Sequence, residues 1–247
     1  MRVSVILGLK SELMHGNLNP EPRKNMEKVA IFGGTFDPIH LGHLIVAETA
    51  LSQLNLDLVI WVPTGHPPHK NGLAYVHRRA MVELAIANHP AFICSPVEVS
   101  PTGTDYAVKT LTALQAIYPQ SQWSWIIGKD AFKTLPRWYG REKLIPACNW
   151  LVAPRPQSIN TTSSPDPGKN RDEIDCCQEV VRAIASSNLK ISWQLLQMPS
   201  VGISSSLIRQ NCQWQRSIRY LVPEVIEAYI TTYNLYKSLS RGSQVRD

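Results

Sequence analysis

The sequence predicts an α/β fold with a doubly wound parallel sheet, contained in a single domain. From residue 28 to about residue 236, short apolar runs alternate with segments in which apolar residues recur at helical spacing. Several of these runs end at a glycine or a proline, as buried strands commonly do. Strands and helices that alternate in this way form a parallel sheet with helices on both faces.

The first half of the chain holds three strand-and-helix pairs. In each pair, an apolar run is followed by a segment with apolar residues every three or four positions, which indicates an amphipathic helix. The pairs are, in chain order, Val29–Phe32 with Gly42–Leu54, Leu56–Val62 with Tyr75–Asn88, and Phe92–Val99 with Tyr106–Tyr118.

The second half adds further strands and helices. Trp123–Ile127 and Trp150–Ala153 are apolar runs, and Lys190–Leu196 is a predicted strand after a helix from about Glu173 to Ala185. A last helix is predicted to begin at Pro223, since proline is common at the first position of a helix. Its predicted apolar face consists of Val222, Val225, Ile226, Tyr229, Ile230 and Tyr233.

The ends of the predicted strands indicate where a ligand binds. In doubly wound sheets, ligands lie beyond the carboxyl ends of the strands. We therefore expect the chemistry to collect near Gly33, Pro63, Gly128 and Pro154, where four of the apolar runs stop.

We expect the domain to span residues 28–237, with a tail at 238–247 and an extension at 1–27 that is disordered. The extension begins with a short apolar stretch, but no small-residue cleavage site of a signal peptide follows it. Residues 156–175 are rich in serine, threonine, proline and aspartate and lack a period, which predicts a polar surface loop.

Composition narrows the classes of partner. The 247 residues are 44% hydrophobic and 18% charged, which excludes a chain that is disordered as a whole. The net charge of +6 lies mostly in residues 1–28 and 237–247, so it gives little support to a nucleic-acid-binding face, and no nucleic acid is expected as a partner.

The five cysteines have no CxxC pair and no metal-ligand spacing, which favours reduced thiols in a cytoplasmic protein without its own metal site. No apolar run approaches the ~18 residues that a membrane helix needs, so no membrane partner is expected.

The most informative segment is GGTFDPIHLGH at residues 33–43, between a predicted strand and a predicted helix. Two glycines let the backbone approach a ligand closely, and the start of the helix directs its positive end at an anion. His40 and His43 are three residues apart, so both imidazoles can face one phosphate, with Gly42 leaving room for a nucleotide. The alternative is a glycine turn with two incidental histidines.

His40-Leu41-Gly42-His43 resembles the HxGH signature of the Rossmann-like nucleotidyltransferase superfamily. The longer string resembles that of the bacterial nicotinate mononucleotide adenylyltransferases. Other segments resemble this family in the same order, from about Lys28 to Tyr236, namely Pro63–Lys70, His77–Met81, Ile126–Asp130, Leu135–Tyr139 and Ile203–Arg209.

The resemblance implies an enzyme of NAD biosynthesis that transfers AMP from ATP to nicotinate mononucleotide, with Mg²⁺ as cofactor of the ATP. It implies His40 and His43 as catalytic residues and Asp37, Tyr106, Trp138 and Tyr139 as residues that bind the mononucleotide. The implied ATP-binding residues are Gly33, Gly34, Thr35, Phe36, His40, His43, Lys70, Gly128, Asp130, Ser204, Ser205, Ser206 and Arg209.

The serine-rich segment has a chemical reason of its own. Three serines at 204–206 open a short helix and offer hydroxyls and free backbone N–H groups, and Arg209 lies one turn later. On its own, this segment is better explained as a serine-capped helix with a solvated arginine, and its pairing with the HxGH string favours the phosphate site. Asp130 could bind a ribose or cap a helix, and Lys70 could be an ordinary loop lysine.

One segment departs from the family. At Gly103–Ala107 the usual pattern is closer to G-x-S-Y-T, so Asp105 and Ala107 replace two hydroxyl residues. These hydroxyls lie near the pyridine substituent in relatives, so the choice between the acid and amide forms of the mononucleotide stays open.

Three other functions fit part of the pattern. A phosphopantetheine-directed transferase would have a shorter chain and would not require the segment Leu135–Tyr139. A non-catalytic nucleotide sensor would keep the phosphate site, and RNA binding would use the high isoelectric point.

Overall fold

The computed structural model describes residues 28–65, 72–95, 97, 106–154 and 169–237. The predicted extension 1–27, the tail 238–247 and most of the predicted loop 156–175 lie outside these ranges, as does Lys70. Within the described residues, no helix is long and apolar enough to cross a membrane.

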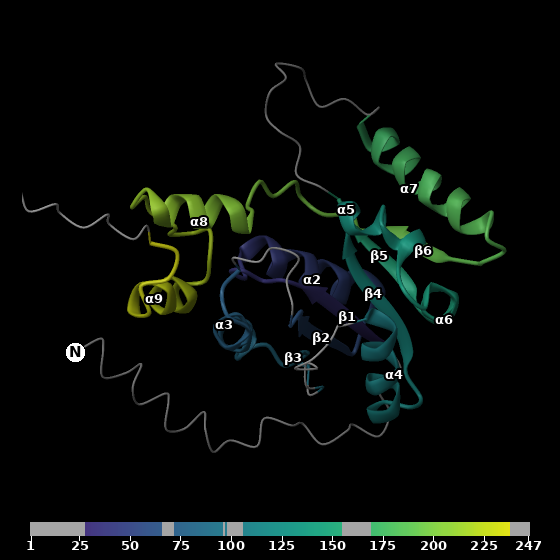
Figure 1. The fold of residues 1–247 in the computed structure, drawn as a ribbon, viewed down its shortest axis with the longest axis horizontal. Coiled ribbons are helices and arrows are strands. Elements are labelled where there is room, and N and C mark those ends of the chain that lie inside the picture. Colours follow the sequence, from purple (N-terminus) through teal and green to yellow (C-terminus); the bar gives the residue numbers. More distant parts are fainter. Residues whose placement is uncertain (1–27, 66–71, 96, 98–105, 155–168, 238–247) are drawn as a thin grey trace, which may run out of the picture.

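Six described strands form one parallel sheet (Figure 1). The order across the sheet is β3 (Phe92–Cys94), β2 (Leu58–Pro63), β1 (Lys28–Gly34), β4 (Gln122–Gly128), β5 (Asn149–Ala153) and β6 (Ser192–Leu195). From β1 the chain builds outward to β3, then returns to the other side of β1. The switch point therefore lies between β1 and β4, the position where such sheets bind ligands.

The central strand β1 is buried on both faces. Ala30 and Phe32 pack in one hydrophobic cluster, while Val29 and Ile31 pack in the cluster on the opposite face. All four side chains are fully or almost fully buried. Alternate residues of a strand point to opposite faces, so a strand covered on both sides is apolar throughout.

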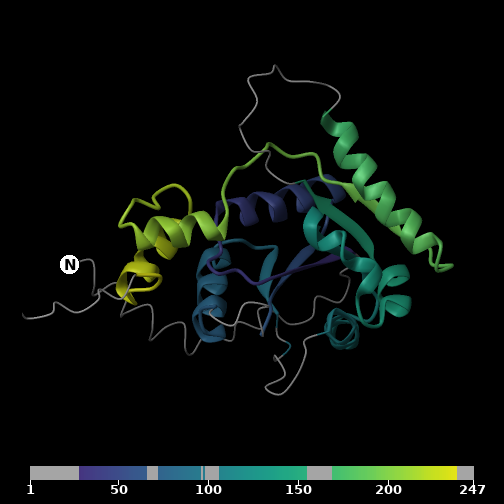
Figure 2. The same ribbon diagram turned by 45° about the horizontal axis from the view of Figure 1, so that its top comes forward.

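Helices cover both faces of the sheet (Figures 1 and 2). The two figures also show α8 and α9 together at one end of the molecule and α7 at the other. The first face carries α2 (Leu41–Leu54), α3 (Tyr75–Ile86), α8 (Ser205–Gln213) and α9 (Glu224–Thr232). The second carries α4 (Ala107–Ile117), α5 (Lys129–Phe132), α6 (Arg141–Ala147) and α7 (Lys169–Ala185), with a 3₁₀ turn, η1, at Leu135–Arg137.

The predicted fold class is confirmed, and the corrections concern the start of one helix and a short helix that the sequence does not predict. Helix α7 begins at Lys169, inside the predicted loop 156–175. The prediction places its start too late, because the first residues of the helix include no apolar residue that would reveal a helical period. Helix α6 is not predicted, since it is short and contains Pro146, which usually interrupts a helix.

The last helix buries a narrower face than its sequence predicts. Ile226 and Ile230 are buried, but Val225 and Tyr233 are 38% and 41% exposed. Pro223 precedes the helix as its N-cap residue, and Tyr233 follows it.

Candidate active site

The turn after β1 is shaped by the packing of Phe36. This residue has a φ of +50°, which is unusual for a residue other than glycine, and its side chain is buried. A Cβ atom at position 34 would lie 2.9 Å from the Phe36 ring, so Gly34 is required where the ring crosses the turn. Gly34 therefore makes room for the Phe36 ring in the turn that joins β1 to α2.

The two histidines of the HxGH string lie face to face. The ring centroids of His40 and His43 are 3.7 Å apart, with 25° between the ring planes. The backbone N–H of His40 donates a hydrogen bond to Nδ1 of His43 at 3.2 Å, and the Phe36 ring lies nearly perpendicular to the His43 ring, with 5.1 Å between the centroids. His40 is buried, whereas His43 is partly exposed.

Both histidines are neutral at pH 7. Burial lowers the pKa of His40 to about 4. Burial also lowers the pKa of His43 well below its usual value, and repulsion from His40 lowers it further. Because Nδ1 of His43 accepts a hydrogen bond, the neutral ring carries its proton on Nε2, which makes Nε2 a donor for an anion.

Gly42 allows the His40 ring to take this position. A Cβ atom at position 42 would lie 3.0 Å from both Cε1 and Nδ1 of His40. The His40 ring is therefore a reason for this glycine that the sequence does not predict, while room for a nucleotide stays a prediction. Nδ1 of His40 is buried and has no hydrogen-bond partner among the described residues.

The serine-rich segment opens α8, as predicted, and is attached to the turn after β1. The hydroxyl of Ser204 caps the helix by accepting a hydrogen bond from the backbone N–H of Leu207 at 3.2 Å. The hydroxyl of Ser205 donates to the backbone carbonyl of Pro38 at 2.9 Å. Ser204 and Ser206 are exposed and Ser205 is partly exposed.

Arg209 provides a second link. Its Nη1 donates to the backbone carbonyl of Asp37 at 2.7 Å, and its Nη2 donates to the Ser206 hydroxyl at 3.3 Å. These bonds fix the guanidinium beside the serines and the turn, although the two segments are about 170 residues apart in the sequence.

The N-termini of α2 and α8 therefore lie side by side. A Cβ atom at position 42, in the first turn of α2, would lie 3.7 Å from the carbonyl oxygen of Ile203, just before α8. Neither helix has an acidic residue in its first turn. Two positive helix ends with nearby histidine, serine and arginine donors form an arrangement that suits a polyanion.

The β4 end of the switch point is open. A Cβ atom at Gly128 would contact nothing within 4 Å, while one at Gly33 would make an ordinary contact with Trp125 at 3.7 Å. Asp130 is exposed in α5, directly after Gly128. This space lies where the predicted nucleotide would pass from one half of the sheet to the other.

The residues predicted for the pyridine ring gather near η1 and the start of α4. Tyr106 and Tyr139 stack with their ring centroids 4.2 Å apart, and Tyr139 is 62% exposed. The indole N–H of Trp138 donates to the Thr134 hydroxyl at 2.9 Å, and its ring packs edge-on against Trp125 and Trp150. The Trp138 side chain is thus held against the core, while the Tyr139 ring contacts Tyr106 and is otherwise largely exposed to solvent.

Two predicted residues form hydrogen bonds with buried parts of the protein. The Asp37 side chain is buried, and both of its carboxylate oxygens accept hydrogen bonds from the protein. The Thr35 carbonyl accepts a hydrogen bond from the buried Arg78 at 2.7 Å. A substrate contact by the Asp37 side chain stays a prediction.

The sequence does not single out two residues that support this site, Arg78 and Tyr236. Arg78 stands in the family-like segment His77–Met81, and the run of two arginines does not reveal which one is buried. Tyr236 contacts Asp37 from 199 residues away, which spacing along the chain cannot predict.

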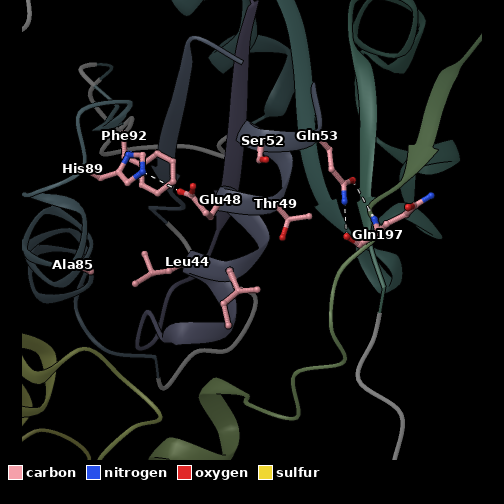
Figure 3. Close-up of a pocket in the computed structure, with 10 residues that line it drawn as sticks. Leu44, Glu48, Thr49, Ser52, Gln53, Ala85, His89, Phe92 and Gln197 are labelled. Carbon is pink, nitrogen blue, oxygen red and sulfur yellow. Dashed lines mark hydrogen bonds and ion pairs between the residues drawn. The ribbon is translucent and has the colours of Figure 1, made fainter. Parts of the chain in front are cut away.

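A separate groove of about 620 Å³ shares none of the predicted site residues (Figure 3). In it, His89 stacks on Phe92 with centroids 3.6 Å apart and pairs with Glu48 at 3.0 Å. Across the groove, the side-chain amide of Gln53 exchanges hydrogen bonds with the backbone of Gln197. Its volume alone does not indicate chemistry, so the candidate active site remains the paired helix ends.

The sheet order and the paired helix ends fit a nucleotidyltransferase, and comparison with known proteins shows that this is the class of the protein. A family model described as cytidylyltransferase-like matches residues 31–211. The "probable nicotinate-nucleotide adenylyltransferase" of Trichormus variabilis is 47% identical over 212 residues, which cover 85% of this chain and 98% of the relative. The protein of the same name from Gloeobacter violaceus is 34% identical over 213 residues, which cover 85% of this chain and 96% of that one.

The chain therefore belongs to the nicotinate-nucleotide adenylyltransferase family, as the HxGH string and the segments that follow it predict. A solved structure, the Plasmodium falciparum nicotinic acid mononucleotide adenylyltransferase complexed with NaAD, has a TM-score of 0.63 and 20% identity. The match covers 85% of this chain and 97% of that one, and it supports the fold.

Proposed function

We propose that this enzyme transfers the adenylyl group of ATP to nicotinate mononucleotide, giving nicotinate adenine dinucleotide and pyrophosphate in NAD biosynthesis. The observation that carries the proposal is the neutral His40–His43 stack at the start of α2, beside the start of α8. Membership of the family supplies the substrates, and the histidine stack supplies donors at the position where a triphosphate fits.

The reaction needs positioning more than a strong base. The 5′-phosphate of the mononucleotide attacks the α-phosphorus of ATP, and the bond from this phosphorus to the bridging oxygen of pyrophosphate breaks. A phosphate monoester is already an adequate nucleophile at neutral pH, so most of the rate enhancement comes from alignment and charge stabilisation.

His40 and His43 act as neutral donors to the α-phosphate oxygens. A neutral imidazole donates one N–H without adding a full charge to a desolvated site. The hydrogen bond into Nδ1 of His43 favours the tautomer that donates from Nε2. As negative charge builds on the phosphoryl oxygens, the attraction between the histidines and the phosphate increases.

Ser204, Ser205, Ser206 and Arg209 bind the β- and γ-phosphates, together with the free backbone N–H groups at the start of α8. Among the described residues, no group of three histidines, cysteines or carboxylates is placed to hold a metal ion. We propose that Mg²⁺ enters with ATP and is held by phosphate oxygens and water. Its role is to neutralise the triphosphate charge.

The mononucleotide occupies the other half of the site. The Trp138 ring stacks on the pyridine, and the backbone at Tyr139 helps to hold the nicotinate carboxylate. The indole N–H bond to Thr134 keeps the Trp138 ring in a fixed orientation for such a contact. The free thiols among the described residues are compatible with a reaction in the cytoplasm.

The test is an assay of the purified protein with ATP and Mg²⁺, supplied in parallel with nicotinate mononucleotide or its amide analogue. We expect dinucleotide and pyrophosphate in equal amounts, with faster formation from the acid. Product from neither mononucleotide would exclude the proposed reaction. Faster formation from the amide would keep the reaction and reverse the proposed substrate preference.

A further inference from the structure

A network of buried polar groups lies behind the turn that carries the HxGH string. The Asp37 side chain is 7% exposed, and its two oxygens have different partners. Oδ1 accepts a hydrogen bond from the Tyr236 hydroxyl at 2.6 Å, and Oδ2 accepts one from the backbone N–H of Leu73 at 3.2 Å. The carboxylate therefore joins the turn to the region before α3 and to the residues after α9.

Arg78 completes the network from α3. Its side chain is fully buried, and its guanidinium donates hydrogen bonds to backbone carbonyl oxygens of three segments. These segments are the turn after β1, the residues after β2 and the segment that leads into α3. The acceptors are Thr35 at 2.7 Å, Thr64 at 2.7 Å, Gly65 at 3.2 Å and Leu73 at 2.9 Å.

The two charged side chains act on the same backbone. Leu73 donates its N–H to Asp37 and accepts from Nε of Arg78 through its carbonyl oxygen. Burial lowers the pKa of Arg78, and the attraction of Asp37 opposes this shift. The buried arginine and the buried carboxylate therefore both bond to Leu73 and form one network. Removal of one member would leave buried polar groups of the others without hydrogen-bond partners.

This network touches the proposed phosphate site through Asp37. The same residue whose carboxylate is held by Tyr236 offers its backbone carbonyl to Nη1 of Arg209 at 2.7 Å. The next residue, Pro38, offers its carbonyl to Ser205. A shift of the turn would therefore move the arginine and the serine together.

We infer that Asp37, Arg78 and Tyr236 are positioning residues that set Arg209 and the serines for the triphosphate. In this role Asp37 acts through buried hydrogen bonds and makes no side-chain contact with the mononucleotide. The inference rests on the proposed function, because that proposal places the triphosphate at the start of α8.

The variant that tests this role is Tyr236→Phe, which removes a single buried hydroxyl. Its matched control is Tyr233→Phe, a tyrosine that follows α9 and is 41% exposed. We expect the KM and the calorimetric Kd for ATP to rise about tenfold in Tyr236→Phe. The KM for the mononucleotide and the kcat at saturation should stay within about threefold of wild type, and the control should match wild type.

Two outcomes would overturn the inference. A lower melting temperature with unchanged kinetic constants would reduce Tyr236 to a structural residue. A rise in KM for the mononucleotide alone would place the Asp37 side chain at that substrate. The calorimetric Kd for ATP keeps the test separate from the proposed function, because it is measurable even if no dinucleotide forms.

A second variant tests whether the residues act as one unit. Asp37→Asn keeps the size of the side chain but replaces one acceptor oxygen with a donor. If Asp37 and Tyr236 work through their shared hydrogen bond, the double variant will weaken ATP binding no more than the more damaging single variant. Losses that multiply in the double variant would show that the two residues act independently and would refute the network.

Discussion

The two ends of the candidate site are built in different ways. At the phosphate end, hydrogen bonds between remote segments hold Ser205 on Pro38 and Arg209 on Asp37, and His40 stacks on its near neighbour His43. At the pyridine end, the side chains come from nearby elements and contact one another mainly through rings, and Tyr139 is 62% exposed.

This difference separates chemistry from recognition. Groups that stabilise a transition state gain most when they need no rearrangement during the reaction, which the hydrogen-bonded phosphate end provides. A loosely covered aromatic end can adapt to the shape of a ring without moving the phosphates. We therefore expect changes to the histidine stack of the phosphate end to alter turnover, and changes at the pyridine end to alter the KM for the mononucleotide.

The largest effect is expected for His43→Ala. It removes the donor whose tautomer is set by the His40 backbone, so kcat should fall about a hundredfold to a thousandfold. Circular dichroism and the melting temperature should change little, because His43 is partly exposed. His89→Ala, in the separate groove, is the control. A turnover close to wild type would remove His43 from the mechanism and end the distinction between the two ends.

Acid should destabilise the protein through His40. Its pKa is about 4 when folded and about 6.5 when unfolded, so between these values only the unfolded chain binds the proton. This proton uptake lowers the free energy of unfolding by about 3 kcal/mol as the pH falls from 7 towards 4.

Urea unfolding of wild type and His40→Gln at pH 7 and pH 4.5 measures this contribution. Carboxylates titrate in both proteins, so the difference between the two pH dependences isolates His40. The variant should lose less stability in acid than wild type. Equal losses would mean that the His40 ring is not held in a desolvated position at the phosphate end.

Gly42→Ala should have an intermediate effect. The added Cβ would lie 3.0 Å from the His40 ring, so the ring must shift by a few tenths of an ångström. We expect kcat to fall about tenfold, with a smaller change in the KM for either substrate. Steady-state kinetics against both substrates is the measurement, and Gly202→Ala, where a Cβ meets nothing within 4 Å, is the control. An unchanged kcat would show that the histidine stack tolerates displacement.

The smallest effect is expected for Tyr139→Ala at the pyridine end. Loss of an exposed stacking partner should raise the KM for the mononucleotide about threefold and leave kcat nearly unchanged. Tyr220→Ala, at another exposed tyrosine, controls for surface changes. A fall in kcat comparable with that of His43→Ala would contradict the separation of chemistry from recognition.

The sequence predicts the strands best where burial is complete. Val29–Phe32 and Trp123–Ile127 lie within observed strands, because strands with helices on both faces are apolar at every position. Helix α6 escapes prediction, since seven residues with an internal proline carry too little periodicity.

The sequence reveals some residues of the candidate site and not others. His40, His43 and the serines are visible in the sequence because their chemistry and spacing are local. Arg78 and Arg79 are adjacent and identical, yet Arg78 is fully buried, whereas Arg79 pairs with Glu83 at the surface at 2.8 Å. Only the fold distinguishes them, as the helix turns one side chain towards the sheet.

The bonds that close the phosphate end also set an order of assembly during synthesis. A nascent chain of 200 residues already contains the six described strands of the sheet, but it lacks Arg209 and Tyr236. Domains commonly begin to fold from the N-terminal side while the ribosome is still translating. On this chain, a nascent domain with a nearly complete sheet lacks part of the proposed triphosphate site, so we expect full affinity for ATP only once Tyr236, which follows α9, has been translated.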